Sequence, residues 1–206
     1  MAKNTKEWIL ACALDLFNEQ GEPNTTTNAI ATEADISPGN LYYHFRSKQD
    51  IVEALFSIYE QRLLELMAVP PDRAADLDDI WLLLHLTFEL IGQYQFIYRD
   101  LTDLCTRYPK IHTRFMGIMN LAKQTASLMA QDLIDSGTMV ATKSERDAMI
   151  ENILLISNFW LANDRIRSSQ GVIDPSRAVS QAIQVLKPFL IPPAREALEG
   201  IGNRYR

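Results

Sequence analysis

The side chains best suited to chemistry lie close together between residues 37 and 44. Asn40 carries an amide that can donate and accept hydrogen bonds at a base edge, and Gly39 has no side chain to keep a partner away from the backbone. Tyr42, Tyr43 and His44 follow, with polar tips that suit phosphate oxygens. These residue types favour recognition of a nucleic acid through hydrogen bonds over covalent catalysis.

Two short helices joined by a tight turn are predicted to position these side chains. Asp35 tolerates the left-handed backbone conformation that a sharp turn needs. Ser37 is a favourable N-cap and Pro38 fits the first helical position, so the second helix is predicted to begin there. Leu41 and Phe45 are four residues apart and should face inward. The pattern predicts a helix-turn-helix whose second helix reads DNA.

An ordinary helical hairpin of an all-α protein would share part of this pattern. The residues that extend it are Ile30-Ala31, Ser37-Pro38-Gly39, Leu41-Tyr42-Tyr43-His44-Phe45 and Ser47-Lys48. Through these motifs the first quarter of the chain resembles the DNA-binding domain of the TetR family of bacterial regulators. The resemblance implies a three-helix DNA-binding domain over residues 1–46 and a larger helical ligand-binding and dimerisation domain over residues 47–206.

A scaffold helix is expected before the hairpin. Asn4 and Glu7 form a capping box for it, and Gly21 is expected to end it. After Gly21 the chain departs from the family pattern, since Glu22-Pro23 stands where an aromatic residue is common. Threonines 25–27 can cap the next helix, and the resemblance implies that Thr26 or Thr27 meets a phosphate there.

The charge of residues 1–50 is unusual for a DNA-binding domain, because four basic and seven acidic side chains give a formal net charge of −3. No carboxylate lies between Ser37 and Ser47, however. We therefore expect neutral phosphate contacts and a shallow dependence of DNA affinity on salt. The predicted DNA-binding residues are Thr26, Thr27, Ser37, Gly39, Asn40, Tyr42, Tyr43, His44 and Lys48.

The composition fits a globular protein that needs no membrane. The 206 residues are 47% hydrophobic, with a mean hydropathy of −0.10. The most apolar segment, residues 80–91, is too short and too polar to cross a bilayer. Residues 1–20 interleave charges with apolar positions, which is not typical of a signal peptide. We expect a cytoplasmic protein.

Beyond residue 47 the apolar spacing is helical throughout, so the expected fold is all-α. Ser47 and Asp50 cap a helix that Pro70-Pro71 stops. Further helices are predicted over residues 77–91, 95–107, 109–136 and 144–168, the last two closed by Gly137 and Gly171. A last helix is predicted to open at Asp174-Pro175, with an interruption at Pro188 and an end at Pro192-Pro193. Residues 194–206 would then add one short turn or fray.

The last two long helices, residues 144–168 and the helix from residue 174, have apolar surfaces wider than one core-facing stripe needs. The resemblance implies that these helices form a four-helix interface between two subunits. A homodimer also suits a palindromic operator, whose half-sites mirror a two-fold axis. The alternative is that the wide faces fill a larger core of a monomer.

The central helices concentrate aromatic and thioether side chains, which favours a pocket for a hydrophobic or amphipathic effector. Residue by residue, core packing explains the aromatic and methionine side chains better than ligand binding does. The candidate effector residues are Trp81, His85, Phe88, Tyr98, Phe115, Met119, Asn120 and Asn152.

An enzyme is the first rival class. His44, His85 and His112 lie far apart in the sequence, and none has a partner at metal-ligand spacing. Glycine-rich phosphate loops and nucleophile elbows are also lacking, so we expect no enzyme, no metal and no cofactor. The second rival is a helical interaction protein of the same fold that has lost DNA binding, which the acidic first 50 residues would favour. We expect instead a ligand-responsive transcriptional repressor that binds a double-stranded operator as a homodimer.

Overall fold

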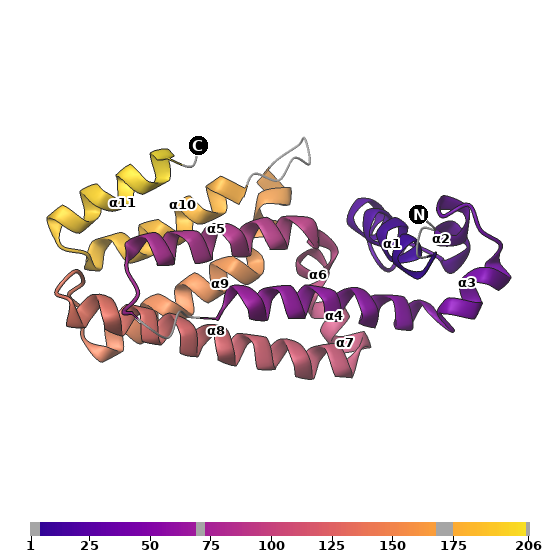
Figure 1. Ribbon diagram of the computed structural model, residues 1–206, viewed down its shortest axis with the longest axis horizontal. Helices are drawn as coiled ribbons and strands as arrows, with labels where there is room; N and C mark the ends of the chain where they lie inside the picture. Colours follow the sequence, from indigo (N-terminus) through magenta and orange to yellow (C-terminus); the bar gives the residue numbers. More distant parts are fainter. Residues whose placement is uncertain (1–4, 69–72, 168–174, 205–206) are drawn as a thin grey trace. The chain divides into compact units, whose positions relative to one another are not determined.

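The computed structural model describes residues 5–68, 73–167 and 175–204, and it confirms the all-α fold (Figure 1). Within these ranges one isolated β-bridge joins Met139 and Leu190. The helices in chain order are α1 (Thr5–Gln20), α2 (Thr27–Glu33), α3 (Pro38–His44), α4 (Lys48–Leu66), α5 (Leu77–Gln93), α6 (Gln95–Arg99), α7 (Leu101–Arg107), α8 (Pro109–Asp135), α9 (Lys143–Arg167), α10 (Pro175–Leu186), the 3₁₀-helix η1 (Lys187–Phe189) and α11 (Pro192–Arg204).

The chain divides into two compact units. The first contains Met1–Arg62 and Tyr94–Phe115, and the second contains Leu63–Gln93 and Met116–Arg206. Helices α4 and α8 therefore contribute residues to both units. The division into domains at residues 46 and 47 stays a prediction. The compact unit that holds α1–α3 also includes α6 and α7.

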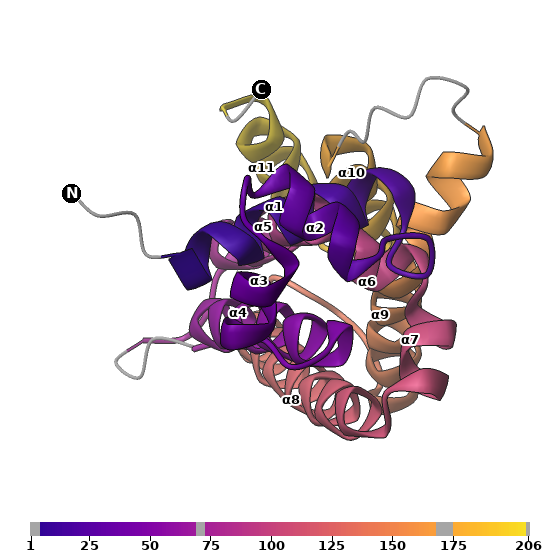
Figure 2. The same cartoon turned by 90° about the vertical axis from the view of Figure 1, so that its right-hand side faces the viewer.

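Helix α1 is the scaffold of the first unit. Its apolar stripe is buried, with Ile9, Ala13 and Phe17 fully out of contact with solvent. The helix ends as predicted at Gly21, whose φ of +93° lies in the left-handed region and whose N–H donates to the Phe17 carbonyl at 3.0 Å. Asn4, one half of the predicted capping box, lies outside the described residues. In the first unit α2 packs against both α1 and α3 (Figure 2).

The predicted helix over residues 95–107 is in fact two helices, α6 and α7, with a break at Asp100. The backbone of Asp100 leaves the helical region, at φ −114° and ψ 24°. Its carboxylate accepts a hydrogen bond from Nε of Arg99 at 3.2 Å. The Asp100 side chain makes no capping hydrogen bond to α7, and the low helix propensity of aspartate fits its place between two helices.

The prediction that Pro192-Pro193 ends the last helix is wrong, because the two prolines begin α11. A proline at the start of a helix costs no hydrogen bond, since the first N–H groups have no acceptor inside the helix. Helix α11 buries Ala194, Leu198 and Ile201, and it packs against α5. The predicted interruption at Pro188 is confirmed as the 3₁₀-helix η1.

The core of the second unit forms where α10 packs along α5 and α9 (Figure 1). Ala178, Val179, Ala182 and Leu186 of α10 are buried there. Pro70-Pro71, Gly171 and Asp174, which were predicted to bound helices, lie outside the described residues. Among the helices that the structure does describe, none is both long enough and apolar enough to cross a membrane.

Substitutions at two glycines test whether the backbone conformation at the end of α1 requires a glycine. A Cβ added to Gly21 would lie 2.7 Å from Nη2 of Arg99, and the positive φ strains any L side chain. We expect Gly21→Ala to lower the free energy of unfolding by about 1–3 kcal/mol. Gly117 in the middle of α8 has no heavy atom within 4 Å of such a Cβ, so Gly117→Ala should raise it by about 0.5–1 kcal/mol. Urea unfolding measures both, and equal effects of the two variants would contradict this account.

Candidate nucleic-acid interface

The turn between α2 and α3 has the backbone that its residue types predict. The hydroxyl of Thr26 caps α2 by accepting from the N–H of Ala29 at 3.1 Å. Asp35 takes a left-handed conformation with φ +55°. The hydroxyl of Ser37 caps α3 by accepting from the N–H of Asn40 at 3.2 Å, with Pro38 at the first helical position. These contacts confirm a capped helix-turn-helix.

Buried side chains fix the hairpin onto α1. Ile30 of α2 and Leu41 of α3 are fully buried, and Phe45 is 4% exposed, as predicted for the inward positions. The indole Nε1 of Trp8 donates to the Ala34 carbonyl at 3.2 Å, which holds the turn against α1. The opposite face of α3 is therefore presented from a rigid base.

The predicted reading residues lie on that exposed face of α3. Gly39 and Asn40 are exposed, and Tyr43 is 83% exposed with its ring edge-on to the ring of His44. Tyr42 is 47% exposed, and its hydroxyl lies 3.0 Å from the hydroxyl of Thr27 on α2. An aromatic side chain as exposed as Tyr43 contributes little to the fold, so its position favours contact with a partner.

Gly39 is not required by the fold. Its φ is not in the left-handed region, and a Cβ added there would meet only Oγ of Ser37, at 3.9 Å. A glycine inside a helix lowers stability relative to alanine. A partner that approaches the backbone of α3 closely would explain the glycine.

Lys48, at the first position of α4, bonds to acceptors inside the protein, whereas a lysine that binds phosphate would have a free ammonium group. Its Nζ donates to the carbonyl oxygens of Glu22 at 2.8 Å and Thr25 at 3.0 Å, and lies 3.1 Å from Oε1 of Glu22. These three acceptors match the three protons of the ammonium group. The phosphate contact stays a prediction, and the geometry adds a role for Lys48 in holding the hairpin.

The sequence analysis did not predict the buried carboxylate of Glu22. Glu22 is fully buried, and it accepts hydrogen bonds from Nη2 of Arg107 and from the hydroxyl of Tyr108. Burial alone would raise the pKa of Glu22, but the hydrogen bonds from Arg107, Tyr108 and Lys48 outweigh it and hold the pKa below 4.5. The side chain is therefore a buried anion, and the only signal in the sequence was the departure from the family pattern at Glu22-Pro23.

A second set of polar contacts joins the end of α1 to α6. The guanidinium of Arg99 donates to the carbonyl of Phe17 at 2.7 Å and to the carbonyl of Asn18 at 3.0 Å. Oδ1 of Asn18 accepts in return from the N–H of Phe96 at 3.0 Å. Arg99 thus donates to two carbonyls of the last turn of α1, and the Phe17 carbonyl accepts this bond in addition to the one from the N–H of Gly21.

Family models match almost the whole chain. The model described as bacterial regulatory proteins of the tetR family matches residues 9–55, which hold the helix-turn-helix. The model described as a bacterial transcriptional repressor, TetR, matches residues 58–198. The chain belongs to the TetR family. It is thus a helix-turn-helix transcriptional regulator.

Individual relatives agree with this assignment. The TetR-family regulator is 32% identical over 140 residues to an uncharacterised HTH-type regulator from the dhlA 5′ region of Xanthobacter autotrophicus, covering 65% of this chain and 68% of that one. It is 24% identical over 199 residues to IcaR, the negative regulator of the biofilm operon icaADBC in Staphylococcus epidermidis, covering 90% and 98%. A solved TetR-family regulator from Marinobacter aquaeolei VT8 superposes with a TM-score of 0.88 at 32% identity, covering 99% and 100%.

The predicted effector residues of the TetR-family regulator do not form one group within either unit. Tyr98 and Phe115 are buried in the first unit, with ring centroids 6.2 Å apart. Burial raises the pKa of Tyr98, and the hydrogen bond with Tyr59 opposes this effect only in part, so that the pKa is about 12. The other candidates belong to the second unit. Trp81 and Phe88 are buried there, and His85 stacks on Trp81. Met119 is half-buried beside Asn158, whereas Asn120 and Asn152 are exposed. The assignment of these eight residues to an effector stays a prediction.

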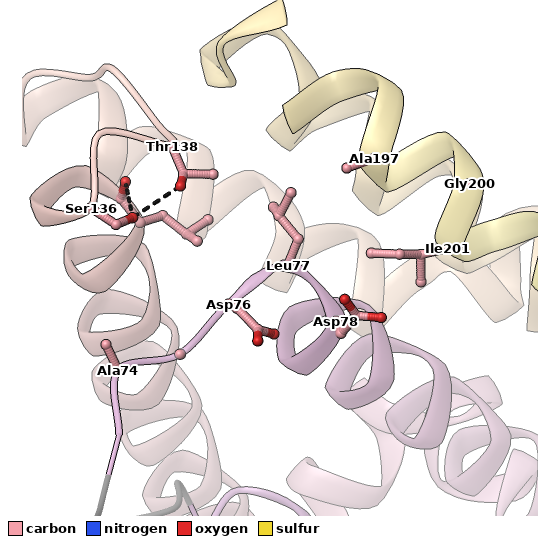
Figure 3. A pocket seen from close by; sticks show the side chains of 11 residues that line it. Ala74, Asp76, Leu77, Asp78, Ser136, Thr138, Ala197, Gly200 and Ile201 are labelled. Carbon is pink, nitrogen blue, oxygen red and sulfur yellow. Dashed lines mark hydrogen bonds between the residues drawn. The ribbon is translucent and has the colours of Figure 1, made fainter. Parts of the chain in front are cut away.

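Two of the hollows in the second unit of the regulator differ in character. A groove of about 690 Å³ opens between α5, the end of α8 and α11, with Asp76 and Asp78 among its polar groups (Figure 3). A smaller cavity of about 160 Å³ is lined mainly by apolar side chains, among them Met67, Leu86 and Met129. None of the eight predicted effector residues lines this cavity. Among the described residues, no group of three or more His, Cys, Asp or Glu is placed to hold a metal ion.

Proposed function

We propose that this TetR-family regulator represses transcription by binding a palindromic operator as a homodimer, with α3 of each subunit in a major groove. The exposed face of α3 carries the proposal, because Gly39, Asn40 and Tyr43 project from a rigid capped hairpin without a fold-related reason for their types. The similarity to IcaR, a negative regulator, supports repression over activation. The rival interaction-protein function gains no support from this intact reading face.

The predicted DNA-binding residues other than Lys48 then have the following roles. Asn40, near the N-terminus of α3, reads a base edge, and Gly39 lets the backbone approach the groove. Tyr42, Tyr43 and His44 bind phosphates on either side. The capped N-termini of α2 at Thr26 and α3 at Ser37 add backbone N–H groups that suit phosphate oxygens, with Thr27 beside Tyr42.

The glycine of α3 provides a test that separates DNA binding from folding. Selection of random duplex DNA on the purified protein should enrich a palindrome, and Tyr42→Ala should fail to bind it.

Gly39→Ala should raise the free energy of unfolding by up to about 1 kcal/mol. The same variant should weaken binding to the selected duplex by about tenfold or more, because the added methyl group keeps the backbone from the groove. A Gly39→Ala variant that is both more stable and fully active would contradict the proposed contact.

We also propose that α9 provides the centre of the dimer interface. Leu155, Phe159 and Ile166 lie on one face of α9 at spacings of four and seven residues, and are 58%, 43% and 87% exposed. A contiguous exposed apolar stripe of this kind favours an interface between subunits. The apolar face of α10 is largely used inside the subunit, and its exposed positions include Ser180, Gln181 and Gln184. Helix α10 would therefore supply the polar rim of the interface.

A charge placed on this stripe should separate the subunits. Phe159→Glu is expected to yield monomers in light scattering after size-exclusion chromatography, because burying one unpaired carboxylate per subunit costs several kcal/mol. Leu128→Glu on α8 is the matched control, since Leu128 is 62% exposed and outside the stripe. A Phe159→Glu protein that remains dimeric, or equal dissociation of both variants, would show that the interface lies elsewhere.

We propose the 160 Å³ cavity as the effector site, because it touches the helix that begins beside the reading helix. Leu66 and Met67, at the end of α4, line this cavity together with residues of α5 and α8. The larger groove has no lining residue from α4. Occupancy of the cavity would displace α4 and change the spacing of the two reading helices, so that effector and operator bind in competition.

The size of this cavity selects a small apolar probe. A dry apolar cavity of about 150 Å³ holds a molecule of the size of benzene. Toluene should therefore raise the thermal midpoint of the wild type and release the selected operator. Leu86→Trp, which fills the cavity, should abolish both effects, whereas Leu128→Trp on the exposed face of α8 should retain them. Release by highly charged metabolites alone, with no response to toluene, would exclude this site.

A further inference from the structure

We infer that Glu22 is a positioning residue for DNA binding, which sets the reading helix in place without contacting DNA. It does so by tying the start of α4 to the junction of α7 and α8. The inference rests on the operator binding proposed above, and it assigns a role in that function to a buried charge outside the reading helix.

One side of this contact is the end of the helix-turn-helix. Lys48 follows the reading helix after only three residues and opens α4. Its ammonium group is saturated by the carbonyls of Glu22 and Thr25 and by the Glu22 carboxylate. Because Thr25 immediately precedes the N-cap of α2, the same lysine holds both ends of the α2–α3 hairpin.

The other side is the junction of α7 and α8. Arg107, the last residue of α7, donates to Oε2 of Glu22, and its guanidinium also bonds Asp103 at 2.8 Å. Tyr108, between the two helices, donates its hydroxyl to Oε1 of Glu22 at 2.8 Å. The two donors lie 85 and 86 residues beyond Glu22 in the sequence.

The charge of Glu22 is what keeps these segments together. Two cations, Lys48 and Arg107, meet at one anion that has no contact with solvent. Without the negative charge the two partly exposed cations would face each other with no anion between them and repel. A neutral side chain at position 22 would therefore let the start of α4 move away from the α7–α8 junction, and the reading helix would move with it.

The test compares two variants with the same change of charge. Glu22→Gln keeps the shape of the side chain, and Glu60→Gln removes a carboxylate of the same unit that pairs with Arg114 at a partly exposed site. We expect Glu22→Gln to weaken binding to the selected operator at least about tenfold, with less than a threefold loss for an unrelated duplex of equal length. Glu60→Gln should change both affinities less than about threefold. Both variants gain one positive unit of charge, so a loss of affinity cannot come from net charge.

A positioning role is separated from a merely structural one by two further readouts. Circular dichroism must show both variants folded at the assay temperature, and a structural defect would weaken operator and unrelated DNA equally. Lys48→Gln should cost less operator affinity in the Glu22→Gln background than in the wild type, because the two groups act as one unit. Fully additive losses would overturn the proposed link between them.

The outcomes are distinct from failure of the proposed function. A folded Glu22→Gln protein that binds the operator within threefold of the wild type would overturn this inference, whereas a wild type that enriches no duplex would overturn operator binding itself. If Glu22→Gln does not fold, Tyr108→Phe carries the test, since it removes only one hydroxyl donor to the carboxylate. That variant should lose about threefold in operator affinity and none for unrelated DNA, and an unchanged operator affinity would overturn the inference.

Discussion

The ionised carboxylate of Glu22 is fully buried, and a charge in that position costs several kcal/mol unless its neighbours compensate it. Arg107, Tyr108 and Lys48 supply that compensation from three different segments. Because these partners come from different segments, the contacts of the carboxylate join the turn after α1, the start of α4 and the α7–α8 junction. The geometry of the reading helix follows from this constraint.

The same constraint explains the unusual charge of the DNA-binding region. Many DNA-binding domains attract phosphates with free lysines and arginines. Here Lys48 is engaged by internal acceptors, and the polar groups of α3 are those of the exposed Asn40, Tyr42 and Tyr43 and of the half-buried His44. In the function that we propose, the reading surface would depend on neutral hydrogen bonds and on the absence of carboxylates from residues 37–47, more than on net positive charge.

The parts of the fold set by local chemistry were predictable from the sequence. The caps at Thr26 and Ser37, the left-handed Asp35 and the end of α1 at Gly21 each depend on residues within four positions. The contacts of Glu22 were not predictable, because they join residues 85 and 86 positions apart and a lone glutamate carries no signal of its partners. Pro192 was misread because a proline that stops one helix can equally begin the next. Apolar side chains such as Trp81 and Phe88 look the same in a core as in a pocket, so the effector site could not be located from composition.

The salt dependence of operator affinity tests most directly whether the reading helix binds through neutral groups. Each phosphate neutralised by a lysine or arginine adds about 0.9 to the slope of log affinity against log salt concentration. With Lys48 engaged by Glu22, we predict a slope of magnitude about 4 for the dimer on its selected operator, which corresponds to roughly two cationic contacts per subunit. A slope of magnitude about 10 would show that many free cations bind the phosphates, and it would contradict this account.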